Sequence, residues 1–134
     1  MNNLFVYGTL MFSEIAQRVI GLSSTEKAEL EDFARYKIIM NGEELFYPAV
    51  KPETGKTTNG ILFRELTSEQ INQLDIFEGT DYRRKKTMIK TDTGGIQAWV
   101  YIWNNPPGSI LAGEWNPQHF YESLLNDFIR SESL

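Results

Sequence analysis

The most informative stretch of this chain is Leu4-Phe5-Val6-Tyr7-Gly8-Thr9-Leu10, an apolar run that leads directly into a glycine turn. The apolar residues predict a short buried strand over 4–7. A helix is expected over 14–20, with Ser13 as its N-cap. A strand, a glycine turn and a helix start together present backbone N–H groups that suit a small anion such as a carboxylate. Residues 7–10 are therefore the first candidate binding loop.

A second informative stretch, Leu74-Asp75-Ile76-Phe77-Glu78-Gly79, lies about seventy residues later and is followed by Tyr82-Arg83-Arg84. A capping box from Thr67 to Gln70 predicts a helix that Gly79 ends. Glu78 would then lie at the negative end of the helix dipole, beside the apolar Ile76 and Phe77, and both effects raise the pKa of its carboxyl group. Such a group suits general acid/base catalysis near neutral pH.

Plainer interpretations of this second stretch stay open. An exposed glutamate before a glycine stop is common, and Asp75 is expected only to accept a hydrogen bond from a neighbouring loop or to be solvated. Tyr82 and Arg84 share one face of the following strand because they are two residues apart. An arginine close to Glu78 would lower the pKa of that carboxyl group and oppose the helix dipole.

Length and composition narrow the class of protein. The chain has 134 residues, which is one domain, and its net charge of −5 argues against nucleic acid as a partner. The basic run Arg83-Arg84-Lys85-Lys86 is too short to change this, and it is read mainly as a solvated strand start. The absence of Cys and the single His exclude a disulfide scaffold and a Cys/His zinc site. No metal is expected, and without an apolar leader or membrane span we expect a cytoplasmic protein.

The remaining pattern predicts short strands, hairpins and three helices. Asn41-Gly42 and Asp92-Thr93-Gly94-Gly95 are hairpin turns, and Asn59-Gly60 is a turn or a kink. Asn116 caps the last helix, whose expected inner face is Phe120, Tyr121, Leu124, Leu125, Phe128 and Ile129. The expected strands cover 25–40 with a break near Asp32, 45–50 with Pro48 at an edge or bulge, 61–63, 82–91 and 96–103, with a loop over 104–115. This pattern indicates an α+β fold, a small antiparallel barrel with helices packed outside.

Several of these segments occur together in one known family. The chain resembles the gamma-glutamylcyclotransferase-like superfamily, in its AIG2-like branch, and the resemblance covers nearly its whole length. The segments that carry it, in this order, are Val6-Tyr7-Gly8-Thr9-Leu10, Tyr47-Pro48-Ala49, Gly60, Leu74-Asp75-Ile76-Phe77-Glu78-Gly79, Tyr82-Arg83-Arg84 and Trp99-Val100-Tyr101.

The resemblance implies one domain over 1–134, a small mixed and mostly antiparallel barrel with a central cavity. It implies cofactor-independent cleavage of gamma-glutamyl amides to 5-oxoproline and a free amine, an acyltransferase-type or amide-cleaving lyase reaction. The loop of Tyr7, Gly8, Thr9 and Leu10 would hold the gamma-glutamyl group, and Glu78 would be the acid/base. Tyr82 and Tyr101 match positions that often line the cavity.

The chemistry of this reaction suits the residues. The substrate's own α-amine attacks its own γ-carbonyl, so the protein supplies no Ser or Cys nucleophile and instead holds the substrate in a ring-like shape. Glu78 can take a proton from the ammonium group and return one to the departing nitrogen. Backbone N–H groups over 8–10 can hold the α-carboxylate or the developing oxyanion.

Two other functions stay open at this point. One is a small-ligand binding module that has kept the pocket without turnover. The weaker one is a glycoside hydrolase that uses Asp75 and Glu78, which share one helix face instead of flanking a bond. Within the cyclotransferase interpretation the leaving amine is open, and it depends on the expected cavity mouth at 41–46 and 104–115. His119 is expected at the surface, and Trp99, Trp103 and Trp115 in the core or cavity wall. The sequence carries no signal of oligomeric state.

Overall fold

The structure, a computed structural model, describes residues 2–21 and 23–134. Its strands close into a mixed barrel in the order β3 (Glu43–Leu66), β1 (Asn2–Val6), β5 (Gly94–Trp103), β4 (Tyr82–Thr91) and β2 (Thr25–Met40), with β2 pairing back onto β3. The β1–β5 pair is parallel, and the other pairs are antiparallel. The expected small, mostly antiparallel α+β barrel is therefore confirmed.

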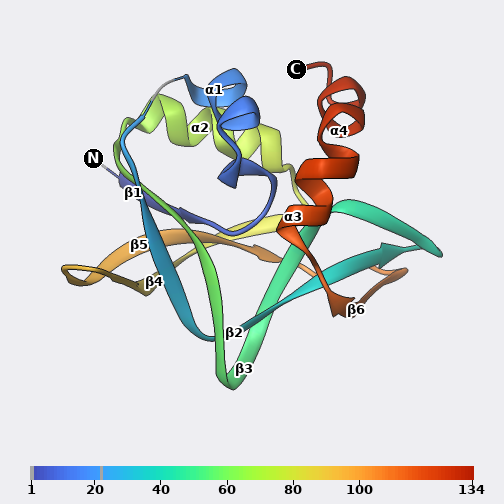
Figure 1. Ribbon diagram of the computed structural model, residues 1–134, viewed down its shortest axis with the longest axis horizontal. Coiled ribbons are helices and arrows are strands. Elements are labelled where there is room, and N and C mark those ends of the chain that lie inside the picture. The colour runs from blue at the N-terminus through green and yellow to red at the C-terminus, as the bar shows by residue number, and fades with distance from the viewer. Residues whose placement is uncertain (1, 22) are drawn as a thin grey trace.

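Helices gather at one end of this barrel (Figure 1). The 3₁₀ turn η1 (Thr9–Met11) leads into α1 (Ser13–Ile20), which contacts α2 (Ser68–Glu78). The chain ends in α3 (Pro117–His119), a π-helical segment η2 (Phe120–Leu124) and α4 (Leu125–Ser131). Among the described residues, no helix has the length and apolar character needed to cross a membrane.

The local helix signals behave mostly as expected. The Thr67 side chain accepts the Gln70 N–H while the Gln70 side chain accepts the Thr67 N–H, so the capping box is confirmed. Gly79 ends α2 with φ 77°, a conformation that favours glycine. The start of α1 is one residue off, because Phe12 is its N-cap and Ser13 is its first helical residue.

The longest hairpin joins β2 and β3 through Asn41 and Gly42, whose φ angles of 50° and 84° fit a tight hairpin turn. The break expected near Asp32 is instead a bend inside one continuous strand. Asp32 has φ 62°, and its carboxylate accepts the Gly55 N–H at 3.0 Å, so both strands turn together at this corner. The corner is the point at the bottom of Figure 1.

Three further expectations need correction or completion. Gly60 is not at a turn but inside β3, where a Cβ atom would lie 2.3 Å from the Val6 carbonyl oxygen, so glycine lets β1 approach. The expected loop over 104–115 contains a strand, β6 (Ser109–Glu114), which adds to the edge of β2. Pro48 pairs with Lys37 beside a register shift, which confirms a bulge.

The C-terminal helical segment follows most of its predicted pattern. The Asn116 side chain caps it by accepting the Gln118 and His119 N–H groups. Phe120 and Phe128 are fully buried, whereas Tyr121 is 45% exposed and was wrongly expected on the inner face. The π-helical turn over 120–124 has a smaller rotation per residue than an α-helix, which breaks a pattern counted at regular α-helical spacing.

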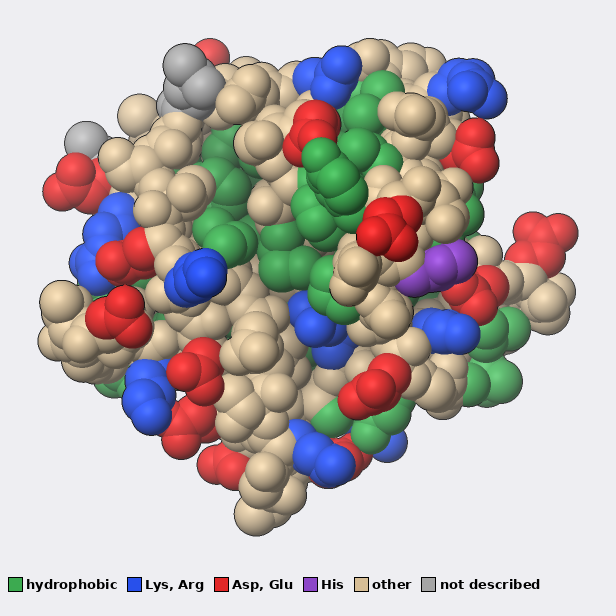
Figure 2. Space-filling model, viewed as in Figure 1, with side chains coloured by type: hydrophobic (Ala, Val, Ile, Leu, Met, Phe, Trp, Pro, Cys, Tyr) green, Lys and Arg blue, Asp and Glu red, His purple; other side chains and the backbone are tan. Residues whose placement is uncertain are grey.

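The hydrophobic core has two parts. One fills the barrel with side chains that include Phe5, Leu30, Leu62 and Val100, and the larger part lies between the barrel and the helices. Hydrophobic side chains reach the surface mainly in the upper half of the face in Figure 2, and charged groups of both signs surround them. The single histidine, purple in that figure, is exposed as expected.

Candidate active site

A cavity of about 30 Å³ opens at the junction of the two core parts, where the barrel meets the end of α2. The residues proposed from the sequence all line it: the loop Tyr7, Gly8, Thr9 and Leu10 after β1, Glu78 at the end of α2, Tyr82 on β4 and Tyr101 on β5. The rest of its wall is Phe5, Val6, Tyr47 and Pro48. Segments that are far apart in sequence thus meet around one space.

The loop over 7–10 is held close to β3. A Cβ atom on Gly8 would lie 2.7 Å from the Pro48 Cδ atom, so only glycine fits against that ring without displacement. The Tyr82 hydroxyl donates to the Pro48 carbonyl oxygen at 2.7 Å. The Tyr82 hydroxyl thus holds Pro48, and the Pro48 ring packs against Gly8. Residues of the cavity wall therefore keep the binding loop in position.

Tyr7 is buried at 5% exposure, and its hydroxyl donates to the Tyr101 carbonyl oxygen at 2.6 Å. Burial raises the pKa of Tyr7 well above its ordinary value, and the nearby Glu78 carboxyl raises it further. The phenol therefore stays protonated at neutral pH. It ties the start of the binding loop to β5.

Of the residues that the structure describes, Glu78 is the only Asp, Glu, Lys, Arg or His that lines the cavity. Removal of its carboxyl group from water, together with the negative charges of Glu132 and Asp75, raises its pKa to about 8. The raised pKa that the sequence predicts is found, and burial is its main cause. The prediction that Ile76 shields the carboxyl group from water is wrong, because Ile76 is 82% exposed. The aromatic cavity wall supplies the desolvation instead.

Asp75 is on the same helix as Glu78, but hydrogen-bond donors surround its carboxyl group. The Arg84 Nε atom donates to Asp75 Oδ1 at 2.7 Å, its second donor to Oδ2 at 3.0 Å, and the Tyr101 hydroxyl to Oδ1 at 2.8 Å. Burial alone would raise the pKa of Asp75, but these hydrogen bonds outweigh it and the pKa is lowered. The acceptor role expected for Asp75 is found, with donors on two strands and not on a loop.

The Asp75–Arg84 pair bears on the question that the sequence left open, which is whether Arg84 lowers the pKa of Glu78. Arg84 is engaged with Asp75 and stacks on Trp99, with its guanidinium carbon 4.4 Å from the ring centroid. Its guanidinium is thus paired with Asp75 and not with Glu78. Two neighbouring carboxyl groups thus have pKa values pushed apart, an arrangement typical of acid/base sites.

Comparison with known proteins gives the family. The family described as gamma-glutamyl cyclotransferase, AIG2-like, matches residues 4–117. The chain belongs to this family. AIG2-like protein D of Arabidopsis thaliana is 27% identical over 134 residues, which cover 97% of this chain and 86% of that protein. AIG2-like protein C of the same plant is 28% identical over 130 residues, 95% of this chain and 73% of that protein.

Solved structures agree with this AIG2-like fold. A solution structure of an Arabidopsis thaliana protein has a TM-score of 0.70 at 25% identity and covers 97% of this chain and 87% of that one. A structure titled gamma-glutamyl cyclotransferase has a TM-score of 0.71 at 17% identity, covering 99% of this chain and 80% of that one. At that identity the second likeness shows the fold alone.

Sequence reasoning missed several residues around the cavity of this AIG2-like protein. Tyr47 and Pro48 were part of the family resemblance but were given no role, and both line the cavity. The proline inside an expected strand was the available signal. Arg35 was not considered at all, although its guanidinium donates to the Tyr7 carbonyl oxygen at 2.8 Å. No local pattern reveals that contact, because the two residues are 28 positions apart.

Proposed function

We propose that this protein is a gamma-glutamyl cyclotransferase that converts gamma-glutamyl amides to 5-oxoproline and a free amine. The observation that carries the proposal is Glu78, a carboxyl group with a pKa of about 8 inside a cavity walled by the 7–10 loop. The family to which the chain belongs supports a cyclotransferase-type activity. The gamma-glutamyl substrate and the roles of single residues are part of the proposal.

In the proposed reaction the α-ammonium group of the substrate first loses a proton to the Glu78 carboxylate. The free amine attacks the γ-carbonyl carbon and closes a five-membered ring. Glu78 then gives its proton to the departing nitrogen, the amide C–N bond breaks, and the ring nitrogen releases its second proton, which the free amine carries away as an ammonium ion. Atoms and charges balance without a cofactor, and a pKa near the working pH lets one carboxyl group perform both transfers.

The walls of the cavity support this chemistry in two ways. The aromatic side chains of Tyr47, Tyr82 and Tyr101 exclude water, which strengthens each hydrogen bond to the substrate. The loop over 7–10 offers backbone N–H donors, the kind of group that stabilises a carboxylate or an oxyanion. Loss of one such donor typically lowers the rate by about a hundred- to a thousandfold.

A binding module without turnover is the second candidate, because a fold and its pocket do not by themselves guarantee turnover. A volume of about 30 Å³ holds little more than a water molecule, so a gamma-glutamyl group must widen the cavity to enter. A hydrolase that uses Asp75 with Glu78 is not proposed, since Asp75 is engaged by Arg84 and Tyr101. The cytoplasmic location expected from the sequence stays a prediction.

The test is 5-oxoproline release from a panel of gamma-glutamyl amides, with Glu78→Gln beside the wild type. The matched control is Glu69→Gln, an exposed glutamate at the other end of the same helix. We expect release by wild type and Glu69→Gln, and none by Glu78→Gln. No release from any panel member, with tight binding in calorimetry, would favour the binding module. The best substrate in the panel identifies the leaving amine.

A further inference from the structure

The proposed substrate brings a charge that the cavity wall does not balance. A gamma-glutamyl group carries an α-carboxylate, and burying an unpaired anion is strongly unfavourable. Among the described residues, no Lys, Arg or His lines the cavity, and its one carboxyl group is negative when ionised. Positive potential for the α-carboxylate must therefore come from backbone dipoles and from a cation behind the wall.

Arg35 on β2 is such a cation. One of its terminal nitrogens donates to the Tyr7 carbonyl oxygen at 2.8 Å and to the Asn59 carbonyl oxygen at 3.0 Å. Its guanidinium lies over the Trp115 ring, 5.6 Å from the centroid. Burial lowers the pKa of Arg35, yet an arginine stays protonated in proteins. A positive charge, with the negative charge of Glu114 near it, is thus held directly behind the binding loop.

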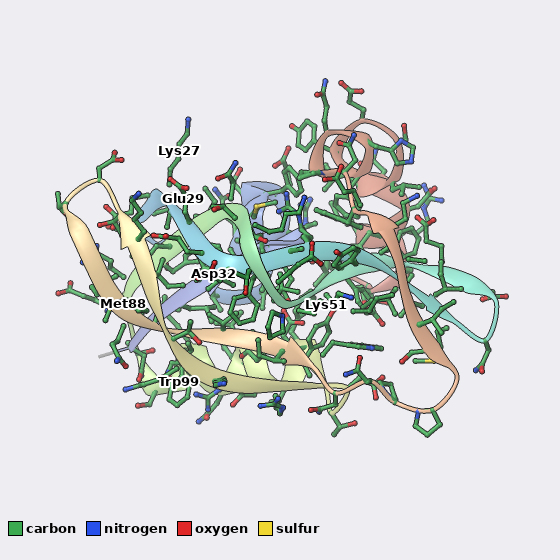
Figure 3. All side chains as sticks on the ribbon, turned by 90° about the horizontal axis from the view of Figure 1, so that it is seen from below. Lys27, Glu29, Asp32, Lys51, Met88 and Trp99 are labelled. Atoms are coloured by element: carbon green, nitrogen blue, oxygen red, sulfur yellow. The ribbon has the colours of Figure 1, made fainter. Side chains whose placement is uncertain are left out.

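Arg35 reaches the loop from the side away from the cavity. Its side chain lines a separate surface hollow together with Lys27 and Glu29. In Figure 3 these two residues lie on the opposite side of the molecule from Trp99, which packs beside the Arg84 and Tyr101 face of the site. The Arg35 Nε atom is buried without a hydrogen-bond partner. Contacts of the guanidinium with Tyr7, Asn59 and Trp115 hold the side chain there.

The contact with Tyr7 fixes the direction of the next N–H group. Described residues contain no cis peptide bond, and in a trans peptide the C=O and N–H groups point in opposite directions. Since the Tyr7 carbonyl points to Arg35, the Gly8 N–H points away from it, and Gly8 is one of the residues that line the cavity. In the part of the chain that the structure describes, no protein acceptor takes this N–H.

We propose that Arg35 is a positioning residue that aims the Gly8 N–H into the cavity and supplies the positive charge against which the substrate's α-carboxylate binds. The inference rests on the proposed function and adds to it the group that recognises the carboxylate. A guanidinium bonded to the carbonyl also polarises the peptide and makes its N–H a stronger donor. The positive charge of Arg35 acts on Tyr7 in the cavity wall, where it lowers the pKa that burial raises.

The test compares binding of two small rings by NMR titration, so that it needs no turnover. 5-Oxoproline carries the carboxylate, and 2-pyrrolidinone is the same ring without it. We expect Arg35→Met to weaken 5-oxoproline binding about ten- to a hundredfold, the usual effect of losing hydrogen bonding to a charged group, and to leave 2-pyrrolidinone binding within about twofold. Arg35→Lys keeps the charge and should recover part of the loss.

The control is Arg64→Met, which removes an arginine from β3 that pairs with Glu26 at the surface. It should bind both rings as the wild type does. If Arg35→Met weakens both rings equally, or neither, the inference is overturned, because a merely structural role predicts equal losses. A wild type that binds no 5-oxoproline and releases none would instead overturn the proposed function, so the two failures are distinguishable.

Discussion

At the scale of single residues, the hydroxyl of Tyr7 shapes the cavity but does not transfer protons. Its high pKa and its hydrogen bond to the Tyr101 carbonyl keep it a donor to the protein. We expect Tyr7→Phe to lower kcat/KM by about fivefold, far less than Glu78→Gln, because it removes one hydrogen bond of about 1 kcal/mol. Steady-state kinetics measure this. Tyr36→Phe, which loses a hydroxyl bonded to Glu53 outside the cavity, is the control.

Asp75 contributes to the proton affinity of Glu78 at the same scale. Its negative charge helps to raise the pKa of Glu78, and it holds Arg84. In Asp75→Asn that charge disappears and Arg84 is less firmly held, so both changes lower the pKa of Glu78. The pH profile of kcat/KM should then move to lower pH. An unchanged profile would show that Asp75 and Glu78 do not interact.

At the scale of secondary structure, the approach of β1 to β3 depends on Gly60. A methyl group there would lie 2.3 Å from the Val6 carbonyl oxygen and 2.5 Å from the Phe5 ring, both inside the core. We expect Gly60→Ala to lower the free energy of unfolding by about 1 to 3 kcal/mol, as overpacking does. Urea denaturation measures the change.

Gly95→Ala on β5 is the matched control for Gly60→Ala. Its new methyl group would meet the Met88 sulfur at 2.9 Å, but Met88 is 57% exposed, lies at the edge of the molecule in Figure 3 and can move aside. The control should lose less than about 1 kcal/mol. Equal losses in the two variants would mean that the close approach of β1 does not limit the fold.

Turns and helix caps could be predicted from the sequence because their signals are local. The Asn41-Gly42 turn, the Thr67 cap, the Gly79 stop and the Asn116 cap depend on atoms within a few residues, and all are found. The strand β6 was missed because its partner, β2, lies far away in sequence. The exposure of Ile76 and Tyr121 likewise depends on which elements pack against each helix.

The candidate site was readable for a different reason. Local patterns singled out the loop over 7–10 and Glu78, and the family resemblance gave them their roles, since local sequence alone favoured a merely exposed glutamate. The structure brings all seven proposed residues around one cavity. The pairing of Arg84 with Asp75 and the contact of Arg35 with Tyr7 join different strands, so no spacing in the sequence predicts them.

At the scale of the whole molecule, the raised pKa of Glu78 links stability to pH. The pKa is about 8 in the folded protein against 4.5 ordinarily, so the folded state binds this proton more tightly. Its contribution to stability is complete below pH 4.5 and is lost as the pH rises to about 8. Wild type should lose at most about 5 kcal/mol from this group. Glu78→Gln should lack this part of the loss, which thermal unfolding across the pH range measures.

The most direct test of the central claim is the pH profile of 5-oxoproline release by the wild type and by Glu78→Gln, with the best substrate of the panel. The account predicts a wild-type kcat/KM that rises about tenfold per pH unit, as for a single ionising group, and levels off near pH 8, the pKa of Glu78. It predicts no release by Glu78→Gln at any pH. A variant that keeps even a tenth of the wild-type rate, or a wild-type profile that is flat between pH 6 and 8, would contradict the role of Glu78 as acid and base.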